Sequence, residues 1–175
     1  MFIVFAVIAT IFLVGTDQLF KYLAVEYLLE TDYVTVIEGF LRFRYVENTG
    51  AVFGSFENHT VLLTIFSVIL LGGAIYLLVT NKNRAKFINI CLVLMVSGGI
   101  GNVIDRIRLG YVIDFIEPTF INFAVFNFAD CLIAVSAFLL IGYLIYDFVK
   151  DLKKNKTNGG ASVVPKATED TDGAK

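Results

Sequence analysis

The stretch from Val61 to Thr80 reads VLLTIFSVILLGGAIYLLVT and carries no charged residue. A helix of about 20 apolar residues is long enough to cross the hydrocarbon core of a bilayer. Runs of the same character occupy residues of about 1–27, 87–104 and 126–146. The sequence therefore predicts a mainly α-helical membrane protein with four transmembrane helices.

The composition of the whole chain agrees with a membrane location. Of its 175 residues, 57% are hydrophobic and 17% are charged, and the mean hydropathy is +0.77. A soluble domain typically has about 25% charged residues. We expect one membrane domain at residues 1–156, with its first span retained rather than cleaved as a signal peptide. A disordered cytoplasmic tail is expected at residues 157–175. We do not expect a nucleic-acid partner.

The distribution of lysine and arginine predicts the orientation in the membrane. Cytoplasmic loops are enriched in these residues, and they gather in segments 81–86 and 150–156. Both segments, and with four spans both termini, are therefore predicted to be cytoplasmic. Residues of about 28–60 and 105–125 then face outward. That side contains four basic residues that we expect to be held by structure or used in function: Arg42, Arg44, Arg106 and Arg108.

The outer segments have the character of β-strands. Residues 33–37 and 40–46 are rich in β-branched and aromatic residues and flank a Glu-Gly turn. In the second run Leu41, Phe43 and Tyr45 alternate with two arginines, which predicts one apolar and one polar face. The later outer loop contains another such run. We expect a small β-sheet and a short β-containing loop on the extracytoplasmic face.

Two aspartates lie where a hydrophobic chain should carry no charge. Asp114 lies in YVIDF at residues 111–115, and Asp130 ends FNFAD at residues 126–130. An ionisable group at the edge of an apolar span is costly and marks a candidate functional site. Two neighbouring carboxyl groups can share one proton. This is the chemistry of peptide hydrolysis by an aspartyl dyad.

Other polar residues fall at the same outer level of the predicted bundle. On a helix, residues three or four positions apart share one face, and three of the groups have this spacing. By segment, the residues are Asp17 and Lys21; Asn48, Gly50 and Ala51; Asn102, Asp105 and Arg106; and Asn127 beside Asp130. Their convergence is more specific than any one motif.

Several of these residues also have a purely structural explanation. Asp17 and Lys21 can form an ion pair within one helix, and Asn48 can be a turn residue. Asp130 can cap the start of a helix. Capping does not explain the second acid, Asp114, on the facing segment. The two aspartates together therefore favour a functional interpretation.

Five blocks of the sequence closely resemble, in order, the signature blocks of the bacterial lipoprotein signal peptidases, also called signal peptidase II. The blocks are DQLFK at 17–21, NTGAVF at 48–53, GNVIDR at 101–106, VIDF at 112–115 and FNFAD at 126–130. They extend from the first predicted span to the fourth. The C-terminal tail lies outside the resemblance.

The resemblance implies a membrane aspartyl endopeptidase of the bacterial inner membrane, with its active site at the extracytoplasmic face. Such enzymes remove the signal peptide from prolipoproteins that carry a lipid on the lipobox cysteine, and they cut on the amino side of that cysteine. We expect contact with membrane lipids and no requirement for a metal or other cofactor. Nothing in the sequence demands more than a monomer, and the oligomeric state stays open. Inhibition by globomycin-like cyclic peptides is expected.

The resemblance also implies roles for the residues of these blocks. Asp114 and Asp130 are the expected catalytic dyad. The other expected roles are substrate binding by Asn48 and Arg106, orientation of the dyad by Asn102 and Asn127, and support by Asp17, Lys21, Gly50, Ala51 and Asp105. We expect Asp17 and Lys21 to fix the first span against the β segment. Asp105 is expected to hold Arg106 or nearby backbone.

Other functional classes fit the sequence less well. A proton-coupled transporter has acids near the membrane midplane and repeated halves, whereas these acids cluster at one face. A serine protease would have to pair Ser97 with His59, which differ in depth by several helical turns. A zinc protease lacks its HExxH motif here. A non-catalytic assembly subunit predicts that Asp114→Asn and Asp130→Asn leave function intact.

Overall fold

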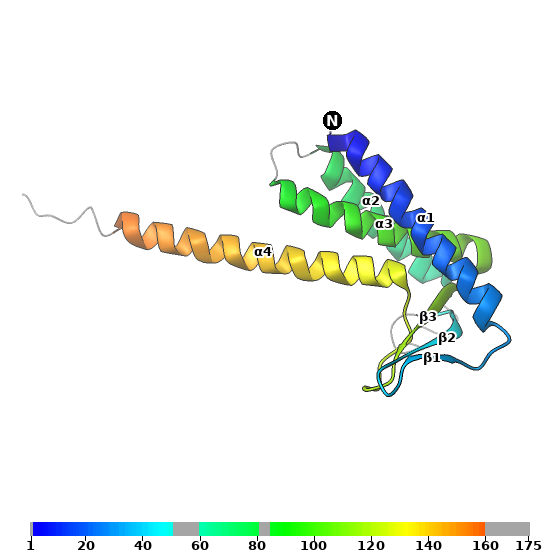
Figure 1. The fold of residues 1–175 in the computed structure, drawn as a ribbon. Coiled ribbons are helices and arrows are strands. Elements are labelled where there is room, and N and C mark those ends of the chain that lie inside the picture. The colour runs from blue at the N-terminus through cyan, green and yellow to red at the C-terminus, as the bar shows by residue number, and fades with distance from the viewer. Residues whose placement is uncertain (1, 51–59, 81–84, 160–175) are drawn as a thin grey trace, which may run out of the picture. The chain divides into compact units, whose positions relative to one another are not determined.

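The computed structural model describes residues 2–50, 60–80 and 85–159, and Figure 1 shows their fold. The described part of the chain contains four long helices: α1 (Phe2–Leu28), α2 (Thr60–Thr80), α3 (Lys86–Leu109) and α4 (Phe128–Gly159). Each is long and apolar enough to cross a membrane. The predicted fold class, a mainly α-helical multi-pass membrane protein, is confirmed.

Two of the helices are longer than the apolar runs that predict them. α3 continues past residue 104 and ends where Gly110 takes a left-handed conformation, with φ at 85°, and donates its N–H to the carbonyl of Arg106. α4 continues past residue 146 to Gly159. Helix ends are set by backbone hydrogen bonds and caps rather than by hydropathy. Asp105 and Arg106 therefore lie in α3, as their spacing from Asn102 predicts, and the loop that was expected from about residue 105 begins after Leu109.

The chain divides into two compact units, Met1–Leu140 and Ile141–Lys175, and the division falls within α4. The first unit holds α1, α2, α3, a β-sheet and the start of α4. The described residues of the second unit form the rest of α4. Of the tail that the sequence predicts, residues 157–159 are helical, and residues 160–175 lie outside the described residues.

α3 is the central helix of the first unit. Of its apolar span 56% is buried, against 11% for α1 and 6% for α2, which both pack along it. Glycines of α3 permit close packing. A side-chain carbon at Gly98 would collide with the carbonyl oxygen of Ala129, and one at Gly101 would lie 2.5 Å from Oδ2 of Asp17. These two glycines let α1 and the start of α4 approach α3.

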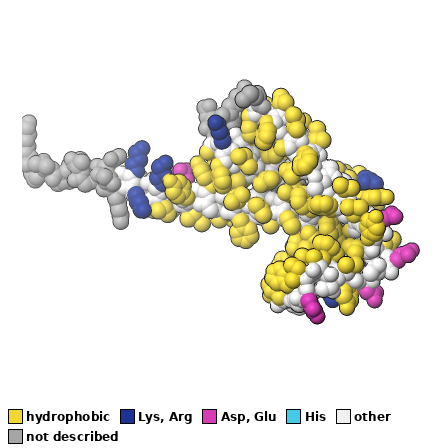
Figure 2. Space-filling view, viewed as in Figure 1, with side chains coloured by type: hydrophobic (Ala, Val, Ile, Leu, Met, Phe, Trp, Pro, Cys, Tyr) yellow, Lys and Arg dark blue, Asp and Glu magenta, His cyan; other side chains and the backbone are white. Residues whose placement is uncertain are grey.

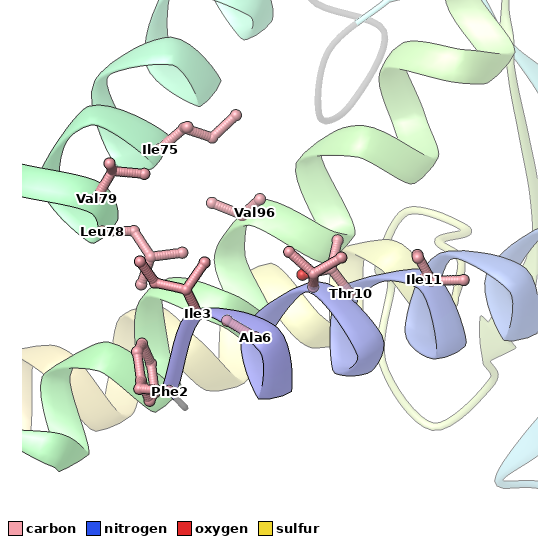
Figure 3. Close-up of a pocket in the computed structure, with 10 residues that line it drawn as sticks. Phe2, Ile3, Ala6, Thr10, Ile11, Ile75, Leu78, Val79 and Val96 are labelled. Carbon is pink, nitrogen blue, oxygen red and sulfur yellow. The ribbon is translucent and has the colours of Figure 1, made fainter.

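A cavity with an apolar lining lies in the first unit, away from the sheet. The N-terminal half of α1 and the last turns of α2 leave this cavity of about 220 Å³ over Val96 of α3 (Figure 3). Thr10 supplies the one hydroxyl group among its lining residues, and none of those residues is ionisable. Hydrophobic side chains also cover most of the visible surface of the helices (Figure 2). This surface suits contact with lipid chains.

The outer segments form one antiparallel sheet. Its strands are β1 (Val34–Ile37), β2 (Leu41–Asn48) and β3 (Val112–Pro118), in the order β1-β2-β3. The first two strands match the predicted runs, and the third lies in the later outer loop, as predicted. In the register between β2 and β3, Val46 is opposite Asp114 and Asn48 is opposite Val112. The pairing therefore brings Asn48 beside the strand that carries Asp114.

The sheet packs on the end of α1 through one apolar face. Ala24 and Leu28 of α1 form a buried core with Ile113 and Phe115 of β3, and Phe43 of β2 packs against it. The predicted alternation along β2 places its aromatic residues on this side. The contact explains why the sheet lies beside the end of α1, close to the ends of α3 and β3 that carry the polar residues.

The arginines of β2 form an ion-pair cluster with β3. Arg42 donates two hydrogen bonds to Glu117, one of them from Nη2 to Oε1 at 2.9 Å. Its guanidinium group also lies 4.7 Å from the ring centre of Tyr33. Nε of Arg44 lies 3.5 Å from Oε2 of Glu117. These two outer arginines are held by structure, which was one of the two outcomes expected for them.

Candidate active site

The site is organised around the start of α4, where Asn127 precedes the first helical residue. Its side-chain oxygen accepts a hydrogen bond from the backbone N–H of Asp130 at 2.9 Å. In return, Oδ2 of Asp130 accepts one from the backbone N–H of Asn127 at 3.2 Å. This reciprocal pair is a capping box, which satisfies amides that a helix start leaves free. It also fixes the direction of the Asp130 carboxyl group.

Asp114 reaches the same helix start from β3. Its side chain is 1% exposed. Oδ1 accepts a hydrogen bond from Nδ2 of Asn127 at 2.6 Å, and Oδ2 accepts one from Nδ2 of Asn48 at 2.8 Å. Asn127 thus contacts Asp114 with its side-chain amide and Asp130 with its backbone N–H. The structure brings together the two aspartates that the sequence singles out.

The surroundings of Asp114 change its ionisation. Burial, followed by the negative charge of Asp130, raises the pKa of Asp114 from 3.8 to about 7. Hydrogen bonds from Asn48 and Asn127 and the charge of Lys21 oppose this rise without cancelling it. At neutral pH the Asp114 carboxyl is therefore protonated in a large fraction of molecules. Because the two acids interact, their titrations belong to the pair.

Asn102 connects the two acids to a second polar cluster. Its Nδ2 donates to Oδ1 of Asp130 at 2.7 Å. Its Oδ1 accepts from Nδ2 of Asn127 at 3.2 Å and from Nζ of Lys21 at 3.0 Å. Asn102 and Asn127 therefore contact the acids that the sequence analysis expects them to orient, and their orienting role stays a prediction.

The second cluster is centred on Lys21, which is 2% exposed. Its Nζ lies 2.9 Å from Oδ2 of Asp17 and 2.9 Å from Oδ2 of Asp105. Asp17 also accepts a hydrogen bond from the backbone N–H of Ala129 at 2.9 Å, and Asp105 accepts one from that of Ile113 at 3.2 Å. The cluster therefore joins α1 to α3, to the start of α4 and to β3.

These contacts can be compared with the supporting roles that the sequence analysis expects for Asp17, Lys21 and Asp105. Within the described residues, the direct partners of Asp17 and Lys21 lie on α3 and at the start of α4 rather than on the β segment. The pair reaches the sheet indirectly, through Asp105, which accepts from the backbone N–H of Ile113 in β3. The contact between α1 and the sheet is apolar. For Asp105, the partner among the two that were expected is nearby backbone, the N–H of Ile113.

The two residues expected to bind substrate differ in their contacts. Asn48 is engaged within the protein, because its Oδ1 accepts from the backbone N–H of Gly50 at 3.0 Å while its Nδ2 donates to Asp114. Arg106 is half-buried and, among residues 2–50, 60–80 and 85–159, its guanidinium group makes no hydrogen bond or ion pair. Its charge acts on Asp130 and Asp114. Ala51 lies outside the described residues.

One residue of the site was not singled out from the sequence. The Nε2 atom of Gln18 donates to Oδ1 of Asp105 at 3.0 Å and to the carbonyl of Gly101 at 3.3 Å. Its Oε1 accepts from Arg108 at 3.5 Å, so a third outer arginine is held by structure. An amide next to Asp17 in an otherwise apolar helix is the signal that would have identified it.

In the described part of the chain, no group of three or more His, Cys, Asp or Glu side chains is placed to hold a metal ion. The oxygens of Asp114 and Asp130 accept hydrogen bonds from amide groups instead. His59, the one histidine of the sequence, lies outside the described residues.

The chain thus combines four helices that can span a membrane with two neighbouring carboxyl groups held by amide partners, which defines a multi-pass membrane protein with a candidate active site. A family model described as signal peptidase (SPase) II matches residues 8–146 of the sequence. The chain belongs to this family of membrane proteases.

Curated relatives agree with this assignment. A lipoprotein signal peptidase from Caldanaerobacter subterraneus subsp. tengcongensis is 41% identical over 140 residues, which are 80% of this chain and 94% of that protein. One from Streptococcus thermophilus is 37% identical over 134 residues, which are 77% of this chain and 88% of the relative. The similarity therefore covers nearly the whole length of both relatives.

Solved structures show the same fold. One, described as a bacterial membrane enzyme determined by the in meso method at 2.3 Å resolution, matches with a TM-score of 0.77 and 27% identity. The match covers 94% of this chain and 96% of the other. A second, determined by the same method at 1.9 Å, has a TM-score of 0.76 and 29% identity over 84% of this chain and 96% of the other.

Proposed function

We propose that this protein removes signal peptides from lipid-modified prolipoproteins, cutting on the amino side of the lipid-bearing cysteine with a dyad formed by Asp114 and Asp130. The family supports the removal of lipoprotein signal peptides. The observation that carries the dyad is the position of Asn127, which binds Asp114 by its side chain and Asp130 by its backbone N–H. One residue thereby holds two acids from different elements.

The proposed reaction needs one proton on the pair. The ionised carboxylate takes a proton from water, and the resulting hydroxide equivalent attacks the scissile carbonyl carbon. The protonated partner donates to the carbonyl oxygen, and a proton then passes to the leaving nitrogen as the C–N bond breaks. The pKa of Asp114, about 7, suits a group that both gives and regains a proton near neutral pH.

Substrate binding is proposed to involve Arg106. A signal peptide that enters as a helix must be unwound where it is cut, and its freed carbonyl groups then need donors at the bilayer edge. Within the described residues the guanidinium group of Arg106 has no hydrogen-bond partner, while its charge acts on both aspartates. Asn48 of β2 donates to Asp114 and so lies beside one acid of the dyad. The acyl chains of the substrate can remain in the lipid.

The proposed location is the bacterial inner membrane, with both termini cytoplasmic and the site at the extracytoplasmic face. Support comes from the basic segments at residues 81–86 and 150–156. The outer arginines that oppose this orientation include Arg42 and Arg44, which are paired with Glu117. We further propose that a monomer is active and that globomycin-like cyclic peptides inhibit it.

The test is a cleavage assay in detergent or liposomes with two precursors, one lipid-modified and the other lacking the lipid. We expect cleavage of the lipid-modified precursor alone. Asp114→Asn and Asp130→Asn should each lower the rate at least about thousandfold. Ser97→Ala is the matched control, because Ser97 is buried and, within the described residues, its hydroxyl group bonds only to the carbonyl of Val93 in α3.

Several outcomes would contradict the proposal. Cleavage that survives both Asp→Asn substitutions would exclude the dyad, and loss of cleavage on adding a chelator would point to a metal. Binding of the precursor without cleavage by the wild-type protein would favour an assembly subunit. Proton-coupled transport would favour the transporter, although the cavity between α1, α2 and α3 is lined by no ionisable residue.

A further inference from the structure

Lys21 uses every donor of its ammonium group inside the protein. An ammonium group has three N–H donors and no acceptor. Nζ of Lys21 lies 2.9 Å from Asp17, 2.9 Å from Asp105 and 3.0 Å from Oδ1 of Asn102. Two of these partners are charged and would suffice for an ion pair. The third, Asn102, leads directly to the candidate dyad.

The contact with Lys21 fixes the direction of the Asn102 amide. A group that can only donate must meet the oxygen of an amide, so the NH₂ group of Asn102 has to point the other way. Nδ2 of Asn102 then donates to Oδ1 of Asp130 at 2.7 Å. The other oxygen of Asp130 accepts from the backbone N–H of Asn127, which also can only donate. Both oxygens of Asp130 are therefore held as acceptors.

The charges around this path come from every element that packs there. α1 contributes Asp17 and Lys21, α3 contributes Asp105 and Arg106, β3 contributes Asp114, and α4 contributes Asp130. Within the described residues the Lys21 cluster has one positive and two negative charges. Removing Lys21 would leave two negative charges close to the acids, in a region where water screens little. The ionised form of Asp130 would become less favourable.

We propose that Lys21 is a positioning residue of the active site: through Asn102 it fixes the orientation of the Asp130 carboxyl group within the dyad. The proposal rests on the proposed function, since it assigns a role within that reaction. Lys21 itself touches neither the substrate nor the reacting atoms. Its effect on Asp130 is transmitted through the side-chain amide of Asn102.

The test begins with Lys21→Met, which keeps the length of the side chain and removes its donors and charge. We expect kcat per folded enzyme to fall about 10- to 100-fold, while KM changes by less than threefold. Both limbs of the pH profile should move to higher pH by about half a unit or more. Lys21→Arg keeps the donors and the charge, and should recover kcat and the wild-type profile in part.

A second variant separates the role of charge from that of position. Lys21→Met combined with Asp105→Asn leaves the cluster with its original net charge, because one positive and one negative group are removed together. We expect its pH profile to return toward that of the wild type while kcat stays low. Where Lys21→Met alone does not fold, this variant supplies the kcat comparison. Melting curves in detergent give the folded fraction.

A double-mutant cycle tests the path through Asn102. If Lys21 acts through that amide, Lys21→Met and Asn102→Ala together should lower kcat no more than the stronger single change. Additive losses, or an unchanged kcat per folded Lys21→Met enzyme with an unchanged pH profile, would overturn the inference. Asp114→Asn and Asp130→Asn in the same assay keep the two proposals distinct. Activity in those variants would overturn the dyad itself.

Discussion

Two ion-pair clusters in this protein use similar groups in different surroundings. In the first, Lys21 lies between Asp17 and Asp105, and all three side chains are at most 2% exposed. In the second, Arg42 pairs with Glu117 on the sheet, with side chains 30% and 13% exposed. Both clusters have close contacts between opposite charges. They differ in how much water reaches them. We call the first the buried cluster and the second, which is only partly exposed, the exposed cluster.

The difference in water access determines what each cluster can do. An exposed ion pair contributes little to stability, because water and salt screen it. A buried charge has to keep its partner, because losing that partner leaves an uncompensated charge in a poorly hydrated place. The buried cluster also joins α1 and α3 to β3 and the start of α4. We therefore expect changes in it to affect both folding and cleavage.

The largest effect is expected for Asp17→Ala. Asp17 is 0% exposed and takes hydrogen bonds from Lys21 and from the backbone N–H of Ala129. Its loss would leave that N–H without an acceptor and Lys21 with one carboxylate. We expect unfolding in detergent to become easier by about 3–5 kcal/mol. Melting curves and the amount of folded protein after purification measure this.

Asp17→Asn is the control for this prediction. It keeps an oxygen that can accept from Ala129 while removing the charge that faces Lys21, so its stability should lie between those of the wild type and Asp17→Ala. Equal stability of Asp17→Ala and the wild type would show that the buried cluster does not hold the helices together. The difference drawn between the two clusters would then fail.

The next effect concerns pH. Because burial and the charge of Asp130 raise the pKa of Asp114 to about 7, the pair loses its last proton as the pH rises through this value. Cleavage should then fall about tenfold per pH unit.

The same shift in the pKa of Asp114 also affects stability, because the folded protein holds a proton that the unfolded chain releases above pH 3.8. The stability from neutral Asp114 is therefore complete below that pH and is lost as the pH rises through 7.

The exposed cluster provides the comparison for the pH profile. A hydrogen bond from Arg42 lowers the pKa of Glu117, so Glu117 stays ionised throughout the range in which cleavage is measured. Glu117→Gln should leave the alkaline limb where it is. A rate that stays constant from pH 6 to 9 in the wild type would contradict the assignment of Asp114.

Packing around the buried cluster should give a moderate effect. A side-chain carbon at Gly101 would lie 2.5 Å from Oδ2 of Asp17 and 3.3 Å from Cβ of Ala129. Since Asp17 is held by its own partners, Gly101→Ala should lower stability by about 1–3 kcal/mol and reduce cleavage. Gly99→Ala is the matched control, because there the new carbon would meet only the flexible end of Leu71 at 3.4 Å. Equal melting temperatures of the two variants would contradict this account.

The clusters also show what the sequence can predict. The spans follow from hydropathy, and spacing along a helix places Asp17 near Lys21 and Asn127 near Asp130. The spacing of residues along one helix does not show which groups on other helices they will contact. The sequence therefore does not predict that Lys21 pairs with α3, or that Asp17 bonds the start of α4. Which partners meet depends on how α3 packs against its neighbours. The glycines of α3 permit close packing, but they do not determine which residues come into contact.

Helix ends were predicted less well for a related reason. α3 and α4 continue after their sequences become polar, because the backbone can keep its hydrogen bonds in water as well as in lipid. Gly110 sets the end of α3 through its left-handed conformation. The capping box at Asn127 and Asp130 needs both side chains in one geometry, which the i, i+3 spacing permits but does not ensure.

The smallest effect is expected for Glu117→Gln in the exposed cluster. The change removes the charge that faces Arg42 and Arg44, but both arginines are partly in water and remain solvated. The glutamine can still accept a hydrogen bond from Arg42. We expect a slight lowering of the melting temperature and no change in kcat or KM. If cleavage fell as strongly as in Lys21→Met, the sheet would have to contact the substrate through this cluster, and exposure alone would no longer separate the two clusters.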